Sequence, residues 1–315
     1  MRAAIDVGST SVHALVAAVE IDGLTALLDE SSFLGLGSTV DGAGRLGVAR
    51  TSELAGVLDA YAGRARALGA ASVAVLGTEP LRRAFDAARV VEALARETGL
   101  ALQVLSQQEE ALLTLVGVTG GRRMRGPLVV VDVGGGSTEI ISAAPDEPPL
   151  IVGLGLGTAR LTGRFVTHDP ATPGEVQAMV DEASATIASL AVGRPHDVIA
   201  VGGTAENLLR VGPGRAGGPD GEGSGTLTRA GLLAALERLA SEPAELAAAR
   251  YGVRPIRARL LPAGAAILLA LIEHWAVDGL RVSASGLREG AILTAAQAGT
   301  GWRDRLPHLG TGWRD

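Results

Sequence analysis

A glycine-rich turn flanked by two acids lies near the middle of the chain, within residues 129–142. An apolar, β-branched run ends on Asp132, three glycines and two hydroxyl residues follow, and a second apolar run begins after Glu139. Glycine has no Cβ, so a phosphate can approach the backbone N–H groups of such a turn closely. The hydroxyls add donors, and the two carboxylates can hold a divalent cation through oxygen. The stretch predicts either a β-hairpin whose tip binds phosphate or an ordinary glycine-rich turn.

The same pattern occurs a second time, in residues 3–16. An apolar run leads to Asp6, Val7 and Gly8, hydroxyl residues follow, and another apolar run completes the stretch. Such a repeat indicates two similar domains, each opening with a hairpin and a phosphate-facing loop. Alternating strand and helix patterns in the rest of the chain indicate α/β layering. We therefore expect two loops that face each other across a cleft and bind one anionic substrate from both sides.

The composition excludes several classes of site. The chain has 315 residues, which is enough for two domains, and it contains neither cysteine nor lysine. Thiolate metal sites, cysteine nucleophiles, a P-loop lysine and a lysine Schiff base are therefore excluded. The formal net charge of −6 argues against nucleic-acid binding. No signal-peptide pattern is present, and the longest apolar run, residues 263–272, is too short to span a bilayer. We expect a soluble cytoplasmic protein that does not bind membranes.

Two adjacent glutamates begin a predicted helix. Ser106 to Glu109 matches a capping box, which gives Glu109 a structural role. Glu110 is not needed for the cap and lies about 100° further round the helix. From the residues alone, Glu110 is either a solvated glutamate favoured by the helix dipole or an acid that faces a cleft. Asp86 is expected to cap the preceding helix, which ends near Thr98.

A third candidate anion site lies further along the chain. A predicted strand at 198–201 ends in a glycine pair and Thr204, and a helix is expected over 205–211. This order of elements binds anions at the N-terminus of a helix. The Gly/Pro-rich residues 212–225 follow and predict a mobile surface loop.

Together these motifs resemble the exopolyphosphatase / guanosine pentaphosphate phosphatase (Ppx/GppA) family, which belongs to the superfamily of actin, hexokinase and the heat-shock chaperones. The sequences of residues 3–11 and 131–139 resemble the two phosphate loops of that family. Glu109-Glu110-Ala111 matches a triplet whose second glutamate acts as the catalytic base on water, and Ser-Gly-Leu-Arg-Glu-Gly at 285–290 resembles a C-terminal signature. The resemblance covers about residues 3–295 and has departures at Thr10, Asp86, Leu112 and Arg259.

The resemblance implies two ribonuclease-H-like α/β domains, residues 1–122 and 123–298, with an interdomain cleft and a tail at 299–315. It implies a hydrolase that releases terminal phosphate from inorganic polyphosphate or guanosine pentaphosphate, with Mg²⁺ or another divalent cation as cofactor, and it is compatible with a homodimer. The implied catalytic base is Glu110, and the implied metal ligands are Asp132, Glu139 and Asp6. The implied phosphate-binding residues are Gly8, Ser9, Thr10, Arg82, Gly134, Gly135, Gly136, Ser137, Thr138, Gly203 and Thr204.

Other interpretations stay open. A kinase of the same superfamily would use the same loops for ATP, and a non-catalytic sensor of polyphosphate or an alarmone would explain the departures. Residues 42–47 match a dinucleotide fingerprint, but no strand runs directly into it. The His168-Asp169 and His196-Asp197 dipeptides lack partners at ligand spacing for a metal-dependent phosphohydrolase. The tail repeats Gly-Thr-Gly-Trp-Arg-Asp at 299–304 and 310–315, for which the sequence suggests no function.

Overall fold

The chain forms two compact units. A computed structural model describes residues 1–315 except 22, 213–224, 310–311 and 313–315. The first unit comprises Met1–Arg125 together with Ser285–Asp315, and the second comprises Gly126–Ala284. Most of the loop expected at 212–225 and most of the second tail repeat lie outside the described residues. The first boundary falls after Arg125, whereas the sequence suggested a boundary after residue 122.

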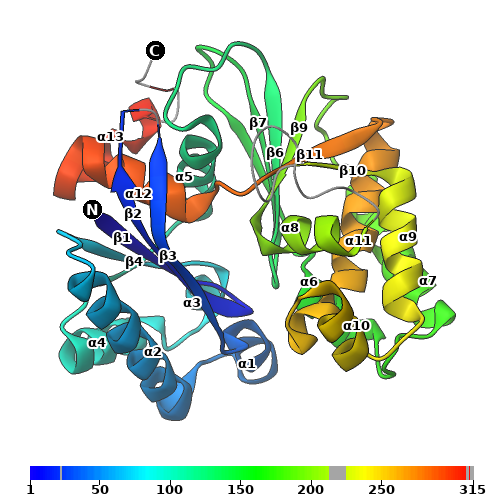
Figure 1. The fold of residues 1–315 in the computed structure, drawn as a ribbon, viewed down its shortest axis with the longest axis horizontal. Helices are drawn as coiled ribbons and strands as arrows, with labels where there is room; N and C mark the ends of the chain where they lie inside the picture. Colours follow the sequence, from blue (N-terminus) through cyan, green and yellow to red (C-terminus); the bar gives the residue numbers. More distant parts are fainter. Residues whose placement is uncertain (22, 213–224, 310–311, 313–315) are drawn as a thin grey trace. The chain divides into compact units, whose positions relative to one another are not determined.

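The first unit contains a five-stranded mixed sheet (Figure 1). Its order is β3-β2-β1-β4-β5, with the first three strands antiparallel and β4 and β5 parallel to β1. The strands are β1 (Arg2–Val7), β2 (Ser11–Val19), β3 (Leu24–Phe33), β4 (Val73–Gly77) and β5 (Leu102–Val104). The hairpin expected around Asp6 is therefore β1–β2.

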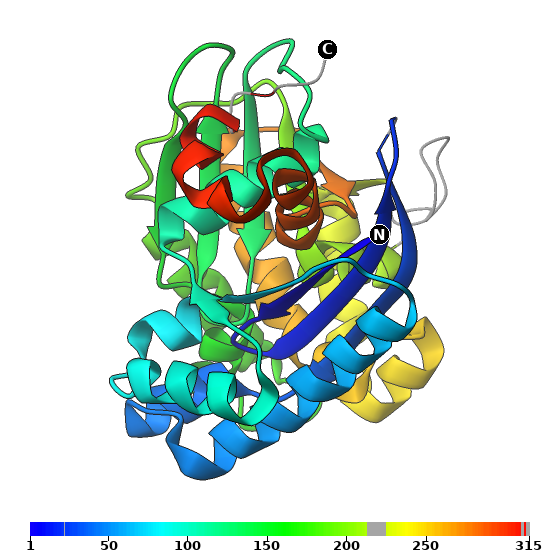
Figure 2. The ribbon, with the colours of Figure 1, turned by 90° about the vertical axis from the view of Figure 1, so that its left-hand side faces the viewer.

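Helices cover both faces of this sheet. Figure 2 shows α2 and α4 on one face and α5 and α12 on the other. On α2, Leu54, Leu58 and Tyr61 are buried against strand residues, as the helical spacing of these apolar side chains predicts. The helices are α1 (Leu36–Ala43), α2 (Gly47–Ala67), α3 (Glu79–Arg83), α4 (Ala87–Thr98), α5 (Gln107–Thr119), α12 (Leu287–Ala298), the 3₁₀ turn η1 (Gly299–Gly301) and α13 (Trp302–Leu309).

Helix α12 packs on α5 through two glycines, and this contact assigns it to the first unit. A Cβ on Gly290 would lie 1.7 Å from the carbonyl oxygen of Leu113, and a Cβ on Gly117 would lie 1.9 Å from that of Gly286. Only glycine permits backbones to approach so closely. The sequence-based division placed residues up to 298 in the second domain, and the structure differs because this packing joins α12 to α5, β1 and β2.

The second unit repeats the strand order of the first. Its sheet runs β10-β11-β9-β6-β7-β8, in which β6, β7 and β8 are antiparallel and β9 and β11 run parallel to β6. Strand β10 is an additional antiparallel edge. The strands are β6 (Leu128–Val133), β7 (Thr138–Ala143), β8 (Leu150–Leu154), β9 (Val198–Val201), β10 (Gly225–Thr228) and β11 (Gly279–Ser283). Hairpins β1–β2 and β6–β7 occupy the same place in their sheets, which confirms the two related halves inferred from the repeat.

The core of the second unit is built around α11. This helix is long and apolar enough to cross a membrane, but 78% of the tested segment is buried inside the protein. It packs against α6, α7, α8, α9 and α10, so the helical core accounts for its apolar character. The helices are α6 (Thr158–Phe165), α7 (Pro173–Ile187), α8 (Gly202–Val211), α9 (Arg229–Ala240), α10 (Ala244–Tyr251) and α11 (Pro255–Trp275).

Candidate functional site

The first predicted phosphate loop closes hairpin β1–β2. Asp6 lies opposite His13 across the hairpin, and the N–H of Gly8 donates to the carbonyl of Ser11 at 3.1 Å. Ser9 and Thr10 form the tip, and both are buried. The start of α1 packs against this tip, because the N–H of Gly37 donates to the carbonyl of Ser9 at 2.8 Å. The loop is therefore fixed in position by the elements around it.

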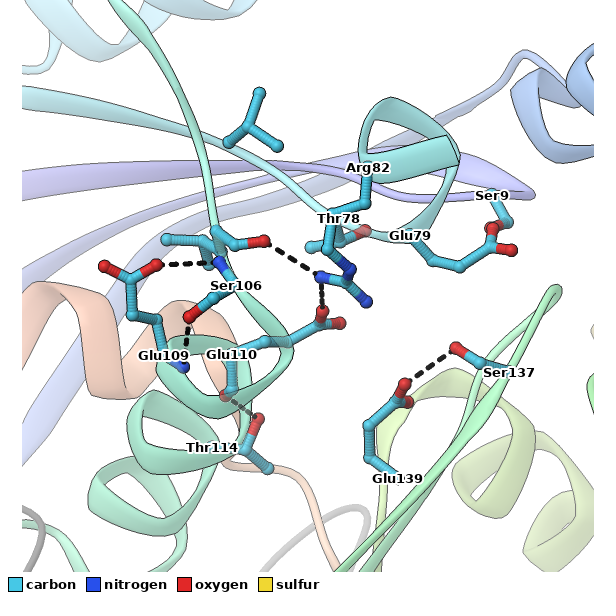
Figure 3. Close-up of polar contacts among 12 residues, drawn as sticks. Ser9, Thr78, Glu79, Arg82, Ser106, Glu109, Glu110, Thr114, Ser137 and Glu139 are labelled. Atoms are coloured by element: carbon cyan, nitrogen blue, oxygen red, sulfur yellow. Dashed lines mark hydrogen bonds and ion pairs between the residues drawn. The ribbon is translucent and has the colours of Figure 1, made fainter. Parts of the chain in front are cut away.

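The second loop closes hairpin β6–β7 in the same way. Asp132 lies opposite Glu139, and the N–H of Gly134 donates to the carbonyl of Ser137 at 2.9 Å. The hydroxyl of Ser137 donates to Glu139 at 2.7 Å (Figure 3). The hydroxyl of Thr138 is directed into the fold, where it donates to the carbonyl of Leu156 at 2.6 Å. That bond gives Thr138 a structural role, and direct phosphate contact by its hydroxyl stays a prediction.

The beginning of α6 donates hydrogen bonds to backbone carbonyl groups of the second loop. The N–H groups of Thr158 and Ala159 each donate at 2.9 Å, to the carbonyls of Gly134 and Gly135 respectively. Gly157 is required at this contact, because a Cβ there would lie 2.4 Å from the oxygen of Gly135. These hydrogen bonds dock the beginning of α6 on the loop.

The glycine pair before Thr204 lies beside Asp132 in the second unit. Gly202 has a left-handed φ of 81°, and a Cβ on it would lie 2.9 Å from Oδ1 of Asp132. The hydroxyl of Thr204 donates to the carbonyl of Val133 at 2.7 Å. The second loop and the start of α8 are therefore joined directly, and Gly203 lies where the N-terminus of that helix adds partial positive charge.

Arg257 is a candidate that sequence reasoning missed. Its Nη2 atom lies 3.4 Å from the position that a Cβ on Gly203 would take. Burial lowers the pKa of its guanidinium, although nearby Glu206 opposes this effect. A buried cation beside a predicted phosphate loop suits an anionic ligand. The sequence signal for Arg257 is its place in Arg257-Ala-Arg259, whose second arginine departs from the family pattern.

Glu110 lies in the first turn of α5, directly after a complete capping box formed by Ser106 and Glu109. The hydroxyl of Ser106 accepts from the N–H of Glu109 at 3.1 Å, and the carboxylate of Glu109 accepts from the N–H of Ser106 at 2.7 Å. This confirms the structural role predicted for Glu109. The neighbouring Glu110 points elsewhere and pairs with Arg82 (Figure 3).

The environment of Glu110 opposes its ionisation. Its side chain is only 13% exposed. Burial raises the pKa of its carboxyl above the usual value, Arg82 lowers it, and nearby Glu79 raises it. Arg82 also donates to the carbonyl of Leu105 at 3.1 Å, which fixes the guanidinium against the strand end. The structure thus brings together two predicted site residues, Arg82 and Glu110, whereas bidentate phosphate binding by Arg82 stays a prediction.

Asp6 lies in the same electrostatic environment. Burial, reinforced by the charge of Glu110, raises the pKa of Asp6 to about 7, while Arg288 lowers it. Within the described residues, Oδ1 of Asp6 is buried without a hydrogen-bond partner. A buried carboxylate oxygen of this kind has unused capacity to accept from a ligand or to coordinate a cation.

The donor set suits Mg²⁺ in chemical type. Asp132 and Glu139 are cross-strand neighbours that offer only oxygen, and Mg²⁺ commonly uses one or two carboxylates with water and substrate phosphates. Among the residues that the structure describes, no three His, Asp or Glu side chains form a metal-binding group. Asp6 belongs to the other unit, so its part in metal binding stays a prediction.

The histidine-aspartate dipeptides make structural contacts. His168 pairs with Glu175 at 2.9 Å, and Asp169 accepts from the N–H of Ala244 at 2.9 Å. Asp197 pairs with Arg281 at 2.5 Å. These contacts assign structural partners to residues that otherwise suggested a metal site.

Three departures from the family pattern have local explanations. Leu112 is buried in α5, an environment that favours an apolar side chain. Arg259 lies 3.8 Å from Asp169. Asp86 was expected to cap α4, but its carboxylate makes no such bond and instead accepts from the N–H groups of Leu46 and Gly47 at 3.0 and 2.9 Å. Asp86 therefore accepts hydrogen bonds from the beginning of α2 and not from the beginning of α4, as its place in the sequence had suggested.

Comparison with known proteins places these features in context. The profile of the Ppx/GppA phosphatase family matches residues 15–298. The chain is 30% identical to "Exopolyphosphatase 1" of Mycobacterium bovis over 302 residues, which cover 92% of this chain and 86% of that protein. The crystal structure of the Aquifex aeolicus Ppx/GppA family member has a TM-score of 0.78 at 27% identity, covering 95% of this chain and 98% of that one.

A second solved structure shows likeness of fold alone. It is an exopolyphosphatase from Cytophaga hutchinsonii, with a TM-score of 0.81 at 20% identity, covering 94% of this chain and 97% of that one. The similarity of the chain to these two solved structures and the matching strand orders of its units confirm the predicted fold class of two ribonuclease-H-like α/β domains.

Proposed function

Because the chain belongs to the Ppx/GppA phosphatase family, we propose that it releases terminal phosphate from inorganic polyphosphate. The observation that carries this proposal is the pairing of a desolvated Glu110 with Arg82 on the first turn of α5. A carboxylate whose pKa is raised above its usual value is better suited to take a proton from water. The names of similar proteins support polyphosphate as the substrate.

Glu110 is proposed to act as the general base. Water attacks the terminal phosphorus, its proton passes to Glu110, and the bond from that phosphorus to the bridging oxygen breaks. The products are phosphate and a chain shortened by one unit. Arg82 orients the carboxylate through their ion pair and supports its ionised form.

The loops are proposed to bind the phosphates. Backbone N–H groups of the two hairpin tips and of the α8 start supply donors, and Arg257 adds a buried positive charge. Asp132 and Glu139, with Asp6 as a further candidate, would hold Mg²⁺, which when bound neutralises charge on the transferred phosphoryl group. A cytoplasmic location belongs to the same proposal.

Guanosine pentaphosphate is the second candidate substrate. It carries the same kind of terminal phosphoanhydride, and the Ppx/GppA phosphatase family takes its name from both kinds of enzyme. The phosphotransferase and the non-catalytic sensor are the remaining alternatives. Phosphorylation of an acceptor without phosphate release would favour the first, and tight binding without turnover would favour the second.

One assay separates these candidates. Phosphate release is measured from short polyphosphate, long polyphosphate, guanosine pentaphosphate and ATP, each with Mg²⁺ and with EDTA. We expect metal-dependent release from polyphosphate. An enzyme that consumes ATP only when an acceptor is phosphorylated, and leaves polyphosphate intact, would contradict the proposal.

A further inference from the structure

Glu79 is a buried acid that the proposed mechanism does not use. It is the first residue of α3 and is 8% exposed. The hydroxyl of Ser9, at the tip of the first loop, donates to Oε2 of Glu79 at 2.6 Å. The two side chains lie close together in Figure 3. A residue distant in sequence therefore acts directly on a loop that was expected to donate to phosphate.

The carboxylate of Glu79 is fixed on both sides. Its other oxygen, Oε1, lies 2.6 Å from Nε of Arg83, and Arg83 also pairs with Asp41 of α1 at 2.7 Å. A carboxylate can only accept hydrogen bonds, and a serine hydroxyl has a single proton. The proton of Ser9 is thus committed to Glu79, and only the lone pairs of its oxygen remain for another partner.

We propose that Glu79 sets the hydrogen-bonding direction of the first loop, so that Ser9 accepts from its ligand and does not donate to it. A phosphate oxygen without a proton cannot donate a hydrogen bond to the hydroxyl oxygen of Ser9. The partner of Ser9 is a group that bears a proton, either a water molecule of the substrate's hydration shell or a protonated phosphate oxygen. Glu79 is therefore a positioning residue that makes the loop bind the phosphate chain through water at this point.

The second loop supports this reading. There Ser137 likewise donates its hydroxyl proton to a glutamate, Glu139, at 2.7 Å. In both hairpins the serine at the tip donates its hydroxyl proton to a glutamate. This glutamate belongs to α3 in the first unit and to strand β7 in the second. The inference rests on the proposed function, and it changes the role predicted for Ser9 from donor to acceptor.

The variant Glu79→Gln tests the direction directly. Arg83 can only donate, so it should hold the amide oxygen of the glutamine and turn the amide NH₂ group toward Ser9. Ser9 then accepts from the glutamine, and its own proton is released for a phosphate oxygen. Binding of inorganic triphosphate to the full chain is measured by calorimetry in EDTA, where turnover is not required. One additional hydrogen bond to a charged group corresponds to an affinity about tenfold higher or more.

A double-mutant cycle separates this hydrogen bond from the loss of negative charge. Glu79→Gln is measured alone and together with Ser9→Ala, and Glu79→Met replaces it if the glutamine variant does not fold. We expect the gain in triphosphate affinity to fall at least fivefold when Ser9 is absent. An equal gain with and without Ser9, or no gain with Ser9 present, would overturn the inference.

Two controls complete the test. Glu109→Gln removes one charge from the same unit without contact to Ser9, so triphosphate affinity should be unchanged. A wild-type protein that neither hydrolyses polyphosphate nor binds triphosphate would contradict the proposed function itself. If the wild type binds triphosphate, but the effects of Glu79→Gln and Ser9→Ala on its affinity are additive, only the proposed role of Glu79 is contradicted.

Discussion

At the scale of single residues, two adjacent glutamates have different tasks. Glu109 completes the capping box and pairs with Arg303 of α13 at 2.8 Å, whereas Glu110 faces Arg82 in a desolvated position. Their positions on the helix account for the difference, because consecutive residues point about 100° apart. The pair therefore offers a matched comparison in which only one member is proposed to touch the reacting water.

We expect Glu110→Gln to lower phosphate release from polyphosphate by about 10²–10⁴-fold, because the amide cannot take a proton from water. Glu109→Gln should retain nearly full activity, since glutamine also completes a capping box. Initial rates at saturating polyphosphate measure both. Equal rates for Glu110→Gln and the wild type would remove the proposed base.

The pH dependence of turnover should report the environment of Glu110. The base must be ionised, so kcat should rise with pH through its pKa, which burial places above the usual range of a glutamate. Arg82→Gln removes the charge that lowers this pKa, so the acidic limb of the profile should move to higher pH. Profiles of kcat from pH 4.5 to 9 would show it, and a limb displaced to lower pH would contradict the assignment.

At the scale of elements, glycines decide where α12 belongs. Gly290 and Gly117 bring the backbones of α12 and α5 into contact, and α5 carries Glu110 on its first turn. A segment from the far end of the sequence thereby supports the helix that holds the proposed base. The C-terminal helix α13 adds to this support, because Leu306 is buried and Arg303 donates to the carbonyl of Val104 at 2.7 Å.

We expect Gly290→Ala to destabilise the protein by about 3 kcal/mol or more, since its Cβ would overlap a backbone oxygen that cannot rotate away. The control is Gly63→Ala, on an exposed part of α2 with no atom near the new Cβ, which should stabilise by about 0.5–1 kcal/mol. Urea unfolding measures both free energies. A Gly290→Ala protein as stable as the wild type would show that the helices can separate at little cost.

At the scale of the whole molecule, one unit is continuous in sequence and the other is not. Residues 126–284 form the second unit, whereas the first combines both ends of the chain. The proposed base lies in the first unit, and the candidate metal ligands Asp132 and Glu139 lie in the second. Neither unit alone therefore contains the complete set of residues proposed for hydrolysis.

We expect a fragment of residues 126–284 to unfold cooperatively and to release no phosphate from polyphosphate. A fragment of residues 123–298, cut where the sequence alone suggested, would carry α12 without α5 and should show unprotected amides in that helix. Thermal melting and hydrogen exchange measure these properties. Protection of α12 in the longer fragment would mean that the helix folds on the second unit.

The sequence by itself determined the local features of this protein. The repeated Asp-Val-Gly hairpins, the capping box before Glu110 and the apolar helix faces are all encoded by residues close together along the chain, and the structure contains them. Local patterns were less informative where turns were short. Strand β3 ends at Phe33, Gly35 adopts a left-handed φ of 62°, and α1 begins at Leu36, a sharp change of direction that apolar spacing does not encode.

Only the tertiary structure decided the contacts between distant residues. It directed Asp86 to the start of α2, joined α12 to α5, placed Arg257 beside Gly203 and brought Glu79 to Ser9. These contacts depend on packing and on the direction of single hydrogen bonds, which spacing along the chain does not encode. The sequence therefore predicted the two loops and the candidate base, and the fold decided how their charges and protons are arranged.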